Sequence, residues 1–550
     1  MGDIIVLENE KRFNIRLLFA IVTIAVGSGF QYGYNIGVVN APQKVMEDFI
    51  NYTEGNRTKG SNFTESQVRA IWSSAVAIYA VGGMIGGLTT SIFAEKFGRK
   101  KGLMIVNTFS IVGGFILGFS KVLKSYEVII LGRLVIGYSS GLHVALAPLF
   151  LVEIAPLKWR GSIGSTFQLV TTISILLSQI IGQPQVLGTS HLWPILFGLI
   201  IIPAVLQTSC LLFCPESPRF VLWKTQNVAS TEKVLKWLRQ KDDVTEELNL
   251  IKVEMDDASK IQKASYYGLI KDPVYRPLFY LSIMIMVSQQ FSGINAIIYY
   301  STQIFKDGGL SVEHALYATM VMGGVNVLVT ILSMWFVERF GRRNLYLTDL
   351  FIEMIICVLI TILLESSVST SVCSTPVRIF CNCEKMSATT RKYELFRIIL
   401  QKTVLNNFIL LFQKTSDQKF AFAVGQVCFI VLYIIVFASG LGSIPLFVVH
   451  ELFDQNTRSL ASSFAIFVNW LCNFIVGLTF PTLANEMHGY VFLIFAFFLF
   501  LAFIYIGYKM PETKNKSPEE VRNAVIYGIN MRTGLSNPSK NVLPVDARQE

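Results

Sequence analysis

Three amide side chains lie close together within one apolar stretch of the chain. Gln289, Gln290 and Asn295 occupy positions i, i+1 and i+6, and an ideal helix places Gln289 and Asn295 within about 120° of each other. Amides offer hydrogen-bond donors and acceptors without charge, which suits an uncharged ligand rich in hydroxyl groups. The alternative is that these amides bond neighbouring helices to one another. The adjacent Ser292-Gly293, where a helix can unwind, favours a binding site.

Two charged turns repeat each other across about half of the chain. Residues 95–100 read EKFGRK and residues 338–343 read ERFGRR, and each turn separates two apolar stretches. A second pair, residues 153–161 and residues 451–458, repeats in the same order. Duplicated halves with the ligand bound between them at mid-membrane are typical of transporters.

The composition indicates an integral membrane protein. The chain is 52% hydrophobic and 15% charged, whereas ordinary soluble domains are about 25% charged. Its apolar stretches are long enough to cross a hydrocarbon core of about 30 Å. Twelve are predicted, near 14–37, 67–92, 102–121, 125–150, 161–184, 190–213, 274–305, 312–337, 345–365, 420–449, 460–483 and 488–510.

Charged residues and sequons predict the orientation. The basic residues of both repeated turns fall on the same side of the membrane. Because Lys and Arg are enriched in cytoplasmic loops, this side is predicted to be the cytoplasmic one. The loop at 38–66, on the opposite side, carries three glycosylation sequons, at Asn51, Asn56 and Asn62. Both termini are therefore expected in the cytoplasm, and anchoring to anionic lipid accounts for the net charge of +10 without nucleic acid.

The expected architecture is all-α, with two six-helix halves. The predicted parts are an N-terminal half (1–213), a linker of cytoplasmic amphipathic helices (214–273), a C-terminal half (274–510) and a cytoplasmic tail (511–550). Residues 366–419 within the C-terminal half do not fit this plan, because they are polar and basic where an outside loop is expected. They are either an extra outside subdomain or retained noncoding sequence, and we favour the latter slightly.

Several motifs together resemble the facilitative glucose transporter family, in the sugar-porter branch of the major facilitator superfamily. The resemblance covers nearly the whole chain except 366–419 and the tail. The motifs that carry it are Gln31-Tyr32-Gly33-Tyr34-Asn35, Asn40-Ala41-Pro42-Gln43, the two glycine-arginine turns, Pro215 to Arg219, Gln289 to Asn295, Tyr299-Tyr300 and Pro511-Glu512-Thr513.

The resemblance implies a major facilitator fold and a role for each matching residue. Gln168, Asn326 and Asn473 would join Gln289, Gln290 and Asn295 as partners of sugar hydroxyls. Tyr299 and Tyr300 would form an outer gate, and the stretch with Gly440, Gly442 and Pro445 a flexible inner gate. A cytoplasmic salt-bridge network would join the halves while the inner side is closed. Its members would be Arg99, Glu153, Arg160, Glu338, Arg342, Glu451 and Arg458.

Some positions depart from the glucose-selective pattern. Leu446 stands where glucose carriers have Trp, and Ala438 replaces a common acidic residue. Met286-Val287-Ser288 replaces the Gln-Leu-Ser triplet linked to glucose preference. Phe437 stands where fructose carriers have His. The identity of the hexose therefore stays open at this point.

Passive transport is expected from span one. Proton-driven relatives place a carboxylate in this stretch, and the chain has Asn35, which cannot ionise. Asp349 and Glu353 in span nine are unusual at a cost of about 2.5–3.5 kcal/mol for an ionised acid at mid-membrane. They are expected on the periphery of the bundle, protonated or interfacial, without a role in coupling.

The leading interpretation is therefore a hexose uniporter, with glucose as the main substrate and fructose alongside. The alternatives are a nontransporting sugar sensor with the same fold, or a fructose-selective carrier. An enzyme is not expected, since the sequence has no Walker loop, nucleophile elbow or metal-ligand cluster. No cofactor or metal is expected, the partners are the sugar and membrane lipid, and the oligomeric state is open. The plasma membrane is the expected location.

Overall fold

The computed structural model describes residues 14–57, 63–156, 159–259, 266–372, 418–453, 455–514, 516 and 518–527. These residues form helices and turns only, without a strand. The helices of the first half and linker are α1 (Ile15–Gly37), α2 (Gln43–Arg57), α3 (Glu65–Lys96), α4 (Arg99–Phe119), α5 (Tyr126–Ile154), α6 (Arg160–Ile181), α7 (Trp193–Gly198), α8 (Ile201–Phe213), α9 (Pro218–Thr225), α10 (Val228–Arg239), α11 (Thr245–Ser259) and α12 (Tyr266–Lys271).

The remaining helices continue from the linker into the tail. They are α13 (Arg276–Gln290), α14 (Ile294–Asp307), α15 (Val312–Phe340), α16 (Arg342–Val372), α20 (Gln418–Val436), the π-helix η5 (Phe437–Leu441), α21 (Ile444–Leu452), α22 (Gln455–Met487), the 3₁₀ turn η6 (His488–Tyr490), α23 (Val491–Lys509) and α24 (Pro518–Tyr527).

Among the described residues, eleven segments are long and apolar enough to cross a membrane. One of them, Leu460–Lys509, is 50 residues long, which at 1.5 Å per residue is about 75 Å, or more than two crossings. It contains most of α22 and the whole of α23, which the turn η6 separates. The chain is therefore an all-α integral membrane protein with twelve crossings, as predicted.

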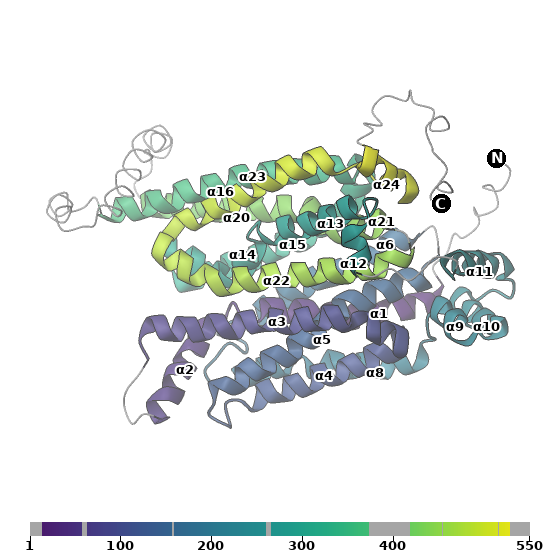
Figure 1. Ribbon diagram of the computed structural model, residues 1–550. Helices are drawn as coiled ribbons and strands as arrows, with labels where there is room; N and C mark the ends of the chain where they lie inside the picture. The colour runs from purple at the N-terminus through teal and green to yellow at the C-terminus, as the bar shows by residue number, and fades with distance from the viewer. Residues whose placement is uncertain are drawn as a thin grey trace.

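The helices of the two parts of the chain lie in two groups. In Figure 1, α1, α3, α4, α5 and α8 lie below, and α13 to α23 lie above. Helix α6 packs against α1 and also against α15, so it belongs to the boundary between the groups. The short helices α9, α10 and α11 gather at one end, which we call the inner end, while α2 lies at the opposite, outer end.

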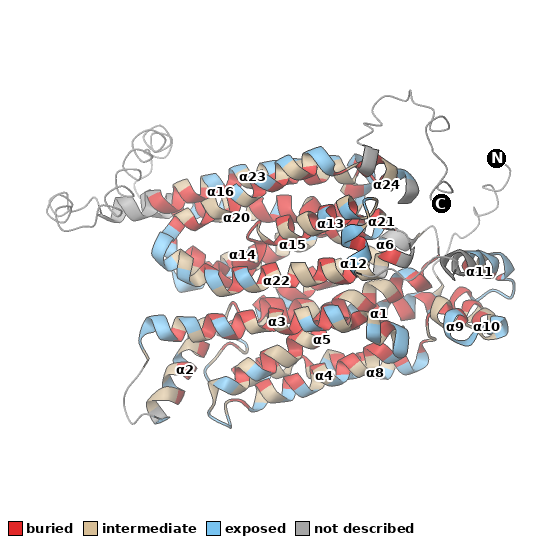
Figure 2. Ribbon diagram, viewed as in Figure 1, coloured by how far each residue is buried: buried red, intermediate tan, exposed pale blue. Residues whose placement is uncertain are grey.

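Burial follows the pattern expected for a bundle in lipid. Buried residues in Figure 2 line the faces where helices meet, and exposed residues lie on the outside. Many exposed residues are large and apolar, such as Phe213 at 74% and Leu328 at 63%. Lipid tails are as apolar as these side chains, so the side chains can face lipid and need not pack against other parts of the protein.

Two elements of the structure were not predicted from sequence. Helix α2 replaces the simple loop expected over 38–66, and α24 lies within the tail that was expected to be only a polar extension. Helix α24 packs against α13 and α21 and buries Val521 completely. In addition, α16 continues through Val372, beyond the expected end of span nine. Most of the unusual segment 366–419 lies outside the described residues.

Helices α3 and α5 approach each other closely because glycines face both backbones. A Cβ atom at Gly137 would lie 2.0 Å from the carbonyl oxygen of Tyr79, and one at Gly82 would lie 2.2 Å from that of Leu134. Small residues at such interfaces allow the van der Waals contact that drives helix association in lipid. The fit between α3 and α5 therefore depends on these glycines.

Gly137→Ala should lower stability, because its methyl group collides with backbone that cannot move aside. Overpacking of this kind costs about 1–3 kcal/mol, so the variant should melt at a lower temperature in detergent. Gly324→Ala in α15 is the matched control, since no atom lies within 4 Å of its added Cβ and alanine favours a helix by about 1 kcal/mol over glycine. Equal melting temperatures for the two variants would contradict the proposed close fit.

Candidate functional site

Span seven is broken where the sequence places Ser292-Gly293. Helix α13 ends at Gln290 and α14 begins at Ile294. Gly293 has φ +96°, and a Cβ there would lie 2.5 Å from the ring of Phe495. Both the backbone conformation and the close ring favour glycine. The break brings the end of α13 and the start of α14, with their three amides, to one place.

The amides of span seven form a hydrogen-bonded chain with span eleven. Asn295 donates its Nδ2 to Gln290 Oε1. Gln290 in turn donates its Nε2 to Asn469 Oδ1 over 2.9 Å, and Asn469 donates its Nδ2 to Gln289 Oε1 over 2.8 Å. Gln290 and Asn469 thus act both as donor and as acceptor, and Asn295 donates at one end. We call Asn295, Gln290, Asn469 and Gln289, in this order, the amide chain.

The amide chain ends on span ten, which is also broken. Gln289 donates its Nε2 to the carbonyl oxygens of Leu441 at 3.0 Å and Gly442 at 3.2 Å. Leu441 is the last residue of the π-helix η5, and Gly442 follows it before α21 begins, where regular α-helical bonding is interrupted. Pro445, in the first turn of α21, has no N–H to donate. The predicted inner-gate stretch is thus irregular and bonded to span seven.

The two tyrosines of span seven are buried at the side of α14 that faces α22. Tyr299 donates its hydroxyl to Asn473 Oδ1 over 3.1 Å, and Tyr300 donates to the carbonyl of Gly477 over 3.1 Å. Their exposed fractions are only 1% and 3%. In this structure both rings are therefore fixed against span eleven.

Bonds between the two groups of helices close the outer end. The side chain of Asn40, just after α1, donates to the carbonyl of Ile298 over 2.6 Å and to Ser301 Oγ over 2.6 Å. Near the same end Arg69 of α3 donates to Asn485 Oδ1 of α22. With Tyr299 and Tyr300 packed inside, the structure is closed at its outer end.

The remaining predicted amides lie apart from the amide chain. Gln168 is half-buried on α6, and Asn326 is buried on α15. These two helices pack together, but none of the hydrogen bonds among the described residues joins Gln168 or Asn326 to the chain. Asn473 lies one helical turn after Asn469 on α22, and its side chain accepts from Tyr299.

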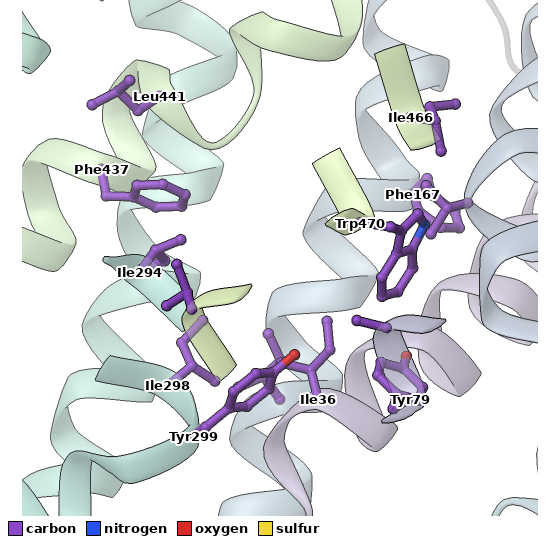
Figure 3. Close-up of a cluster of buried hydrophobic side chains, with 14 of the residues drawn as sticks. Ile36, Tyr79, Phe167, Ile294, Ile298, Tyr299, Phe437, Leu441, Ile466 and Trp470 are labelled. Carbon is purple, nitrogen blue, oxygen red and sulfur yellow. The ribbon is translucent and has the colours of Figure 1, made fainter. Parts of the chain in front are cut away.

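Trp470, the residue after Asn469 in the sequence, inserts from α22 into the other group of helices, where Figure 3 shows it near Tyr79 and Phe167. Its ring lies 6.0 Å from Tyr32 and 5.5 Å from Tyr79, both in edge-on contact. A Cβ at Gly83 would lie 2.4 Å from the indole, so the glycine makes room for it. Neither Asn469 nor Trp470 was predicted, although Asn469 and Asn473 lie four residues apart and share a helix face.

The glycine-arginine turn of the first half is held by two acidic residues. Arg99 Nη2 lies 2.7 Å from Glu153 Oε1, which forms an ion pair inside this half. The carboxylate of Glu216 accepts the backbone N–H groups of Arg99 and Lys100, each at 3.0 Å, at the start of α4. An acid at this position suits the positive end of the helix dipole. Burial raises the pKa of Glu216, and these N–H bonds oppose that rise.

The turn of the second half repeats this arrangement. Arg342 Nη2 lies 3.4 Å from Glu451 Oε1. The carboxylate of Glu512 accepts the backbone N–H groups of Arg342 at 2.9 Å and of Arg343 at 3.1 Å, at the start of α16. Both turns use a glycine at positive φ, Gly98 at +84° and Gly341 at +85°. The sequence repeat is thus a structural repeat.

These two ion pairs lie within one half each and do not cross between the halves. Glu338 is exposed at the end of α15, and Arg458 donates to the carbonyl of Phe453 in its own half. The side chain of Arg160 lies outside the described part. The expected cross-half network belongs to a conformation closed at the inner end, so it stays a prediction.

The three sequons are not equivalent in the folded chain. Asn51 lies half-buried in α2, and the Thr53 of its sequon is 1% exposed and bonded to the carbonyl of Ile50. The side chain of Asn56 and the whole of Asn62 lie outside the described residues. Glycosylation stays a prediction.

The fold is that of the major facilitator superfamily. The xylose transporter XylE from E. coli, in a partially occluded inward-open conformation, matches with a TM-score of 0.67 and 21% identity over 91% of this chain and 99% of that chain. A second structure of this proton:xylose symporter of the major facilitator superfamily, bound to 6-bromo-6-deoxy-D-glucose, matches with a TM-score of 0.66 and 22% identity over 92% of this chain and 98% of that chain.

Sequence comparisons define the family within that fold. The family model described as "Sugar (and other) transporter" matches residues 20–383 and 375–525. Solute carrier family 2, facilitated glucose transporter member 3 from Canis lupus familiaris is 37% identical over 514 residues, which are 94% of this chain and 93% of that protein. The protein of the same name from Homo sapiens is 38% identical over 512 residues, 92% of each chain. The chain belongs to the facilitated glucose transporter family of sugar transporters.

Glu512→Ala should lower the melting temperature in detergent, because the first N–H groups of α16 lose their acceptor. Loss of such a cap costs about 0.5–2 kcal/mol. Glu338→Ala removes the same charge from an exposed position of the same inner end and should change the melting temperature little. An equal effect of both substitutions would show that net charge, and not the cap, sets this stability.

Proposed function

We propose that this protein is a facilitative carrier of hexoses, with glucose as its main substrate and fructose as a second one, and that it works by alternating access. The observation that carries the proposal is the amide chain at the break of span seven. It presents neutral donors and acceptors next to the boundary between the halves. Family membership supports the substrate class, since the relatives are named facilitated glucose transporters.

The amide chain suggests how a sugar binds without charge. A hydroxyl group both donates and accepts, as an amide does, so it can insert between two amides and replace their mutual bond by two bonds to sugar. Gln290 bonds Asn295 and Asn469 here and would turn to the sugar. Gln168, Asn326 and Asn473 would bind further hydroxyls from the surrounding helices, with Trp470 as a flat apolar wall.

The polar contacts of span one support passive transport. Asn35 is buried and donates its Nδ2 to the carbonyl of Gln31 over 2.7 Å. Arg133 donates to the carbonyl of Asn35 over 3.0 Å and stacks on the ring of Tyr79 at 4.4 Å. The arginine thus finds a neutral acceptor and a ring where a proton-driven carrier would offer a titrating carboxylate.

Alternating access would exchange the outer contacts for inner ones. Opening the outer end breaks the Asn40 bonds and frees Tyr299 and Tyr300. Closing the inner end would bring the two acid-capped turns together, so that Arg160, Glu338 and Arg458 could pair across the halves. The Gly440 to Pro445 stretch would bend as the inner gate.

The proposed division of the chain and its orientation follow the predicted ones. Six crossings before the linker and six after it would move as two halves. The basic turns at the inner end favour a cytoplasmic location for that end and for both termini. The sequons would then face outside, and the plasma membrane is the proposed location.

Purified protein in liposomes should let labelled glucose enter until both sides are equal, and fructose more slowly. An imposed proton gradient should not raise the final glucose level above the external one. Accumulation would contradict passive transport. Binding without uptake would support the sensor alternative, and uptake of fructose alone would support a fructose-selective carrier. Liposomes without protein provide the background rate.

Asn469→Ala should weaken glucose transport through affinity. Its removal takes one hydrogen-bond partner from each of Gln289 and Gln290, and it also takes one from the hydroxyl group of a bound sugar. An unpaired hydroxyl costs about 1–3 kcal/mol, so the half-saturating concentration should rise about tenfold. Thr479→Ala is the control on the same helix, since Thr479 is exposed and donates its hydroxyl to the carbonyl of Ile475 in its own helix. If both variants transport as the parent does, the amide chain is structural.

A further inference from the structure

Two acidic residues are buried inside the second half, away from the amide chain. Asp349 and Glu353 lie one turn apart on α16, with exposed fractions of 3% and 0%. Residues four apart share a helix face, so both carboxyl groups point in the same general direction. From the sequence they are expected at the periphery of the bundle, protonated or interfacial. In the structure both are buried, and Asp349 contacts span ten.

Asp349 contacts the break of span ten directly. Its Oδ1 accepts the hydroxyl of Ser439 over 2.9 Å. Its Oδ2 occupies the place of the missing side chain at Gly440, where a Cβ would lie 2.2 Å away. Ser439 and Gly440 both belong to the π-helix η5. The position of the carboxyl group is therefore tied to the shape of the proposed inner gate.

Within the described part of the chain, the carboxyl group of Glu353 is buried without a hydrogen-bond partner. Both of its carboxyl oxygens are inaccessible and have no hydrogen bond among the described residues, and Asp349 Oδ2 is in the same condition. An ionised carboxylate without a partner in a low-dielectric interior costs many kcal/mol. A second acid one turn away adds repulsion. The neutral, protonated form of Glu353 is therefore the form that fits this conformation.

Among the residues that the structure describes, the titratable groups that interact with the two acids are tyrosines and a cysteine, which carry no positive charge. Tyr346 and Cys357 of α16 and Tyr433 of α20 interact electrostatically with the acids. Tyr346 pairs with Ser288 over 2.8 Å, and Tyr433 donates to the carbonyl of Ser292 over 3.0 Å, which connects the site to the break of span seven.

The other elements packed on α16 are α15, α21, α23 and η6. The charged and histidine side chains of these elements lie at helix ends. Of their tyrosines, Tyr505 interacts with Tyr280. Tyr317 and Tyr508 are exposed. These end groups are Glu313, His314, Glu338, Arg339, His450, Glu451, His488 and Lys509. Among the described residues no three His, Cys, Asp or Glu side chains gather as a metal site.

We propose that Asp349 and Glu353 form a proton-binding site whose occupancy is linked to the shape of span ten. In the present conformation the proton stays on the pair, because the surroundings are closed and apolar. When span ten moves and water reaches the carboxyl groups, the O–H bond breaks and the proton passes to water. The reverse movement takes a proton from water and restores the neutral acid.

The sign of the pH effect follows from this linkage. Acid conditions favour the closed, protonated pair and the present conformation, and alkaline conditions favour conformations in which the pair is hydrated. One linked proton changes the ratio of the two conformations by at most tenfold per pH unit. A proton that enters and leaves on the same side changes the rate of sugar movement but does not drive accumulation.

The direct test is a pH titration of tryptophan fluorescence in full-length protein reconstituted in nanodiscs, which does not depend on transport. The signal should change between about pH 5 and about pH 9 in the parent and stay flat in Glu353→Gln, whose amide mimics the neutral acid. Glu365→Gln is the control, since this acid of α16 already accepts the N–H of Gly489 over 3.0 Å. It should keep the parental titration.

Exchange of labelled glucose at equal pH on both sides gives a second readout, which rests on the proposed function. The parental rate should vary severalfold over the same pH range, and Asp349→Asn and Glu353→Gln should flatten that profile while keeping uptake at acid pH. Variants that retain the parental titration and profile, or a parent insensitive to pH in both assays, would overturn the proposal.

Two further outcomes separate this proposal from the proposed function. A parent that shows the fluorescence titration but moves no glucose at any pH would support the proton site and contradict the carrier. Glucose accumulation under a proton gradient that Glu353→Gln abolishes would also support the proton site, and would overturn passive transport. The melting temperature of each variant in the nanodisc verifies that it is folded.

Discussion

A broken helix inside a membrane must find hydrogen-bond partners within the protein, and this constraint shapes the second half of the molecule. Lipid offers no donor to a free carbonyl and no acceptor to a free N–H. Spans seven and ten are both interrupted near mid-length, and the carbonyls of Leu441 and Gly442 are satisfied by the amide of Gln289. The second break thus relies on a side chain at the first. Neither span can change its bend without breaking a bond that water or a ligand must replace.

The same constraint explains why the amides are arranged as a chain. A single Gln in an apolar bundle would leave donors unsatisfied, whereas Asn295, Gln290, Asn469 and Gln289 pair in sequence and end on backbone carbonyls. Such a chain is stable when empty, yet each of its bonds can be exchanged for an equivalent bond to a hydroxyl group. An interior that exchanges bonds of similar strength binds its ligand only modestly, which a carrier needs, since tight binding in one state would trap it.

Much of this could be predicted from sequence, because the relevant signals are local. Crossings follow from apolar length, and the break at Gly293 follows from a glycine beside a serine. The turns at Gly98 and Gly341 could be expected from their repetition, whereas their acid caps, Glu216 and Glu512, come from distant parts of the chain. Contacts between distant helices could not, because their register is set by packing. Asn469 meets Gln289 only once α22 has docked on α13, and Trp470 enters the other half only because Gly83 leaves room for it.

The burial of Asp349 shows the limit of sequence reasoning most clearly. An ionised acid inside a membrane span has a high free energy, so a position near the lipid headgroups is expected. The structure instead places its carboxyl group in the notch of Gly440, bonded to Ser439. A glycine in an irregular span is usually explained by backbone freedom, but Gly440 has an ordinary negative φ. Because Gly440 has no side chain, the carboxyl group of Asp349 can pack directly against the bend of span ten. A movement of span ten would therefore change the surroundings of this acid of span nine.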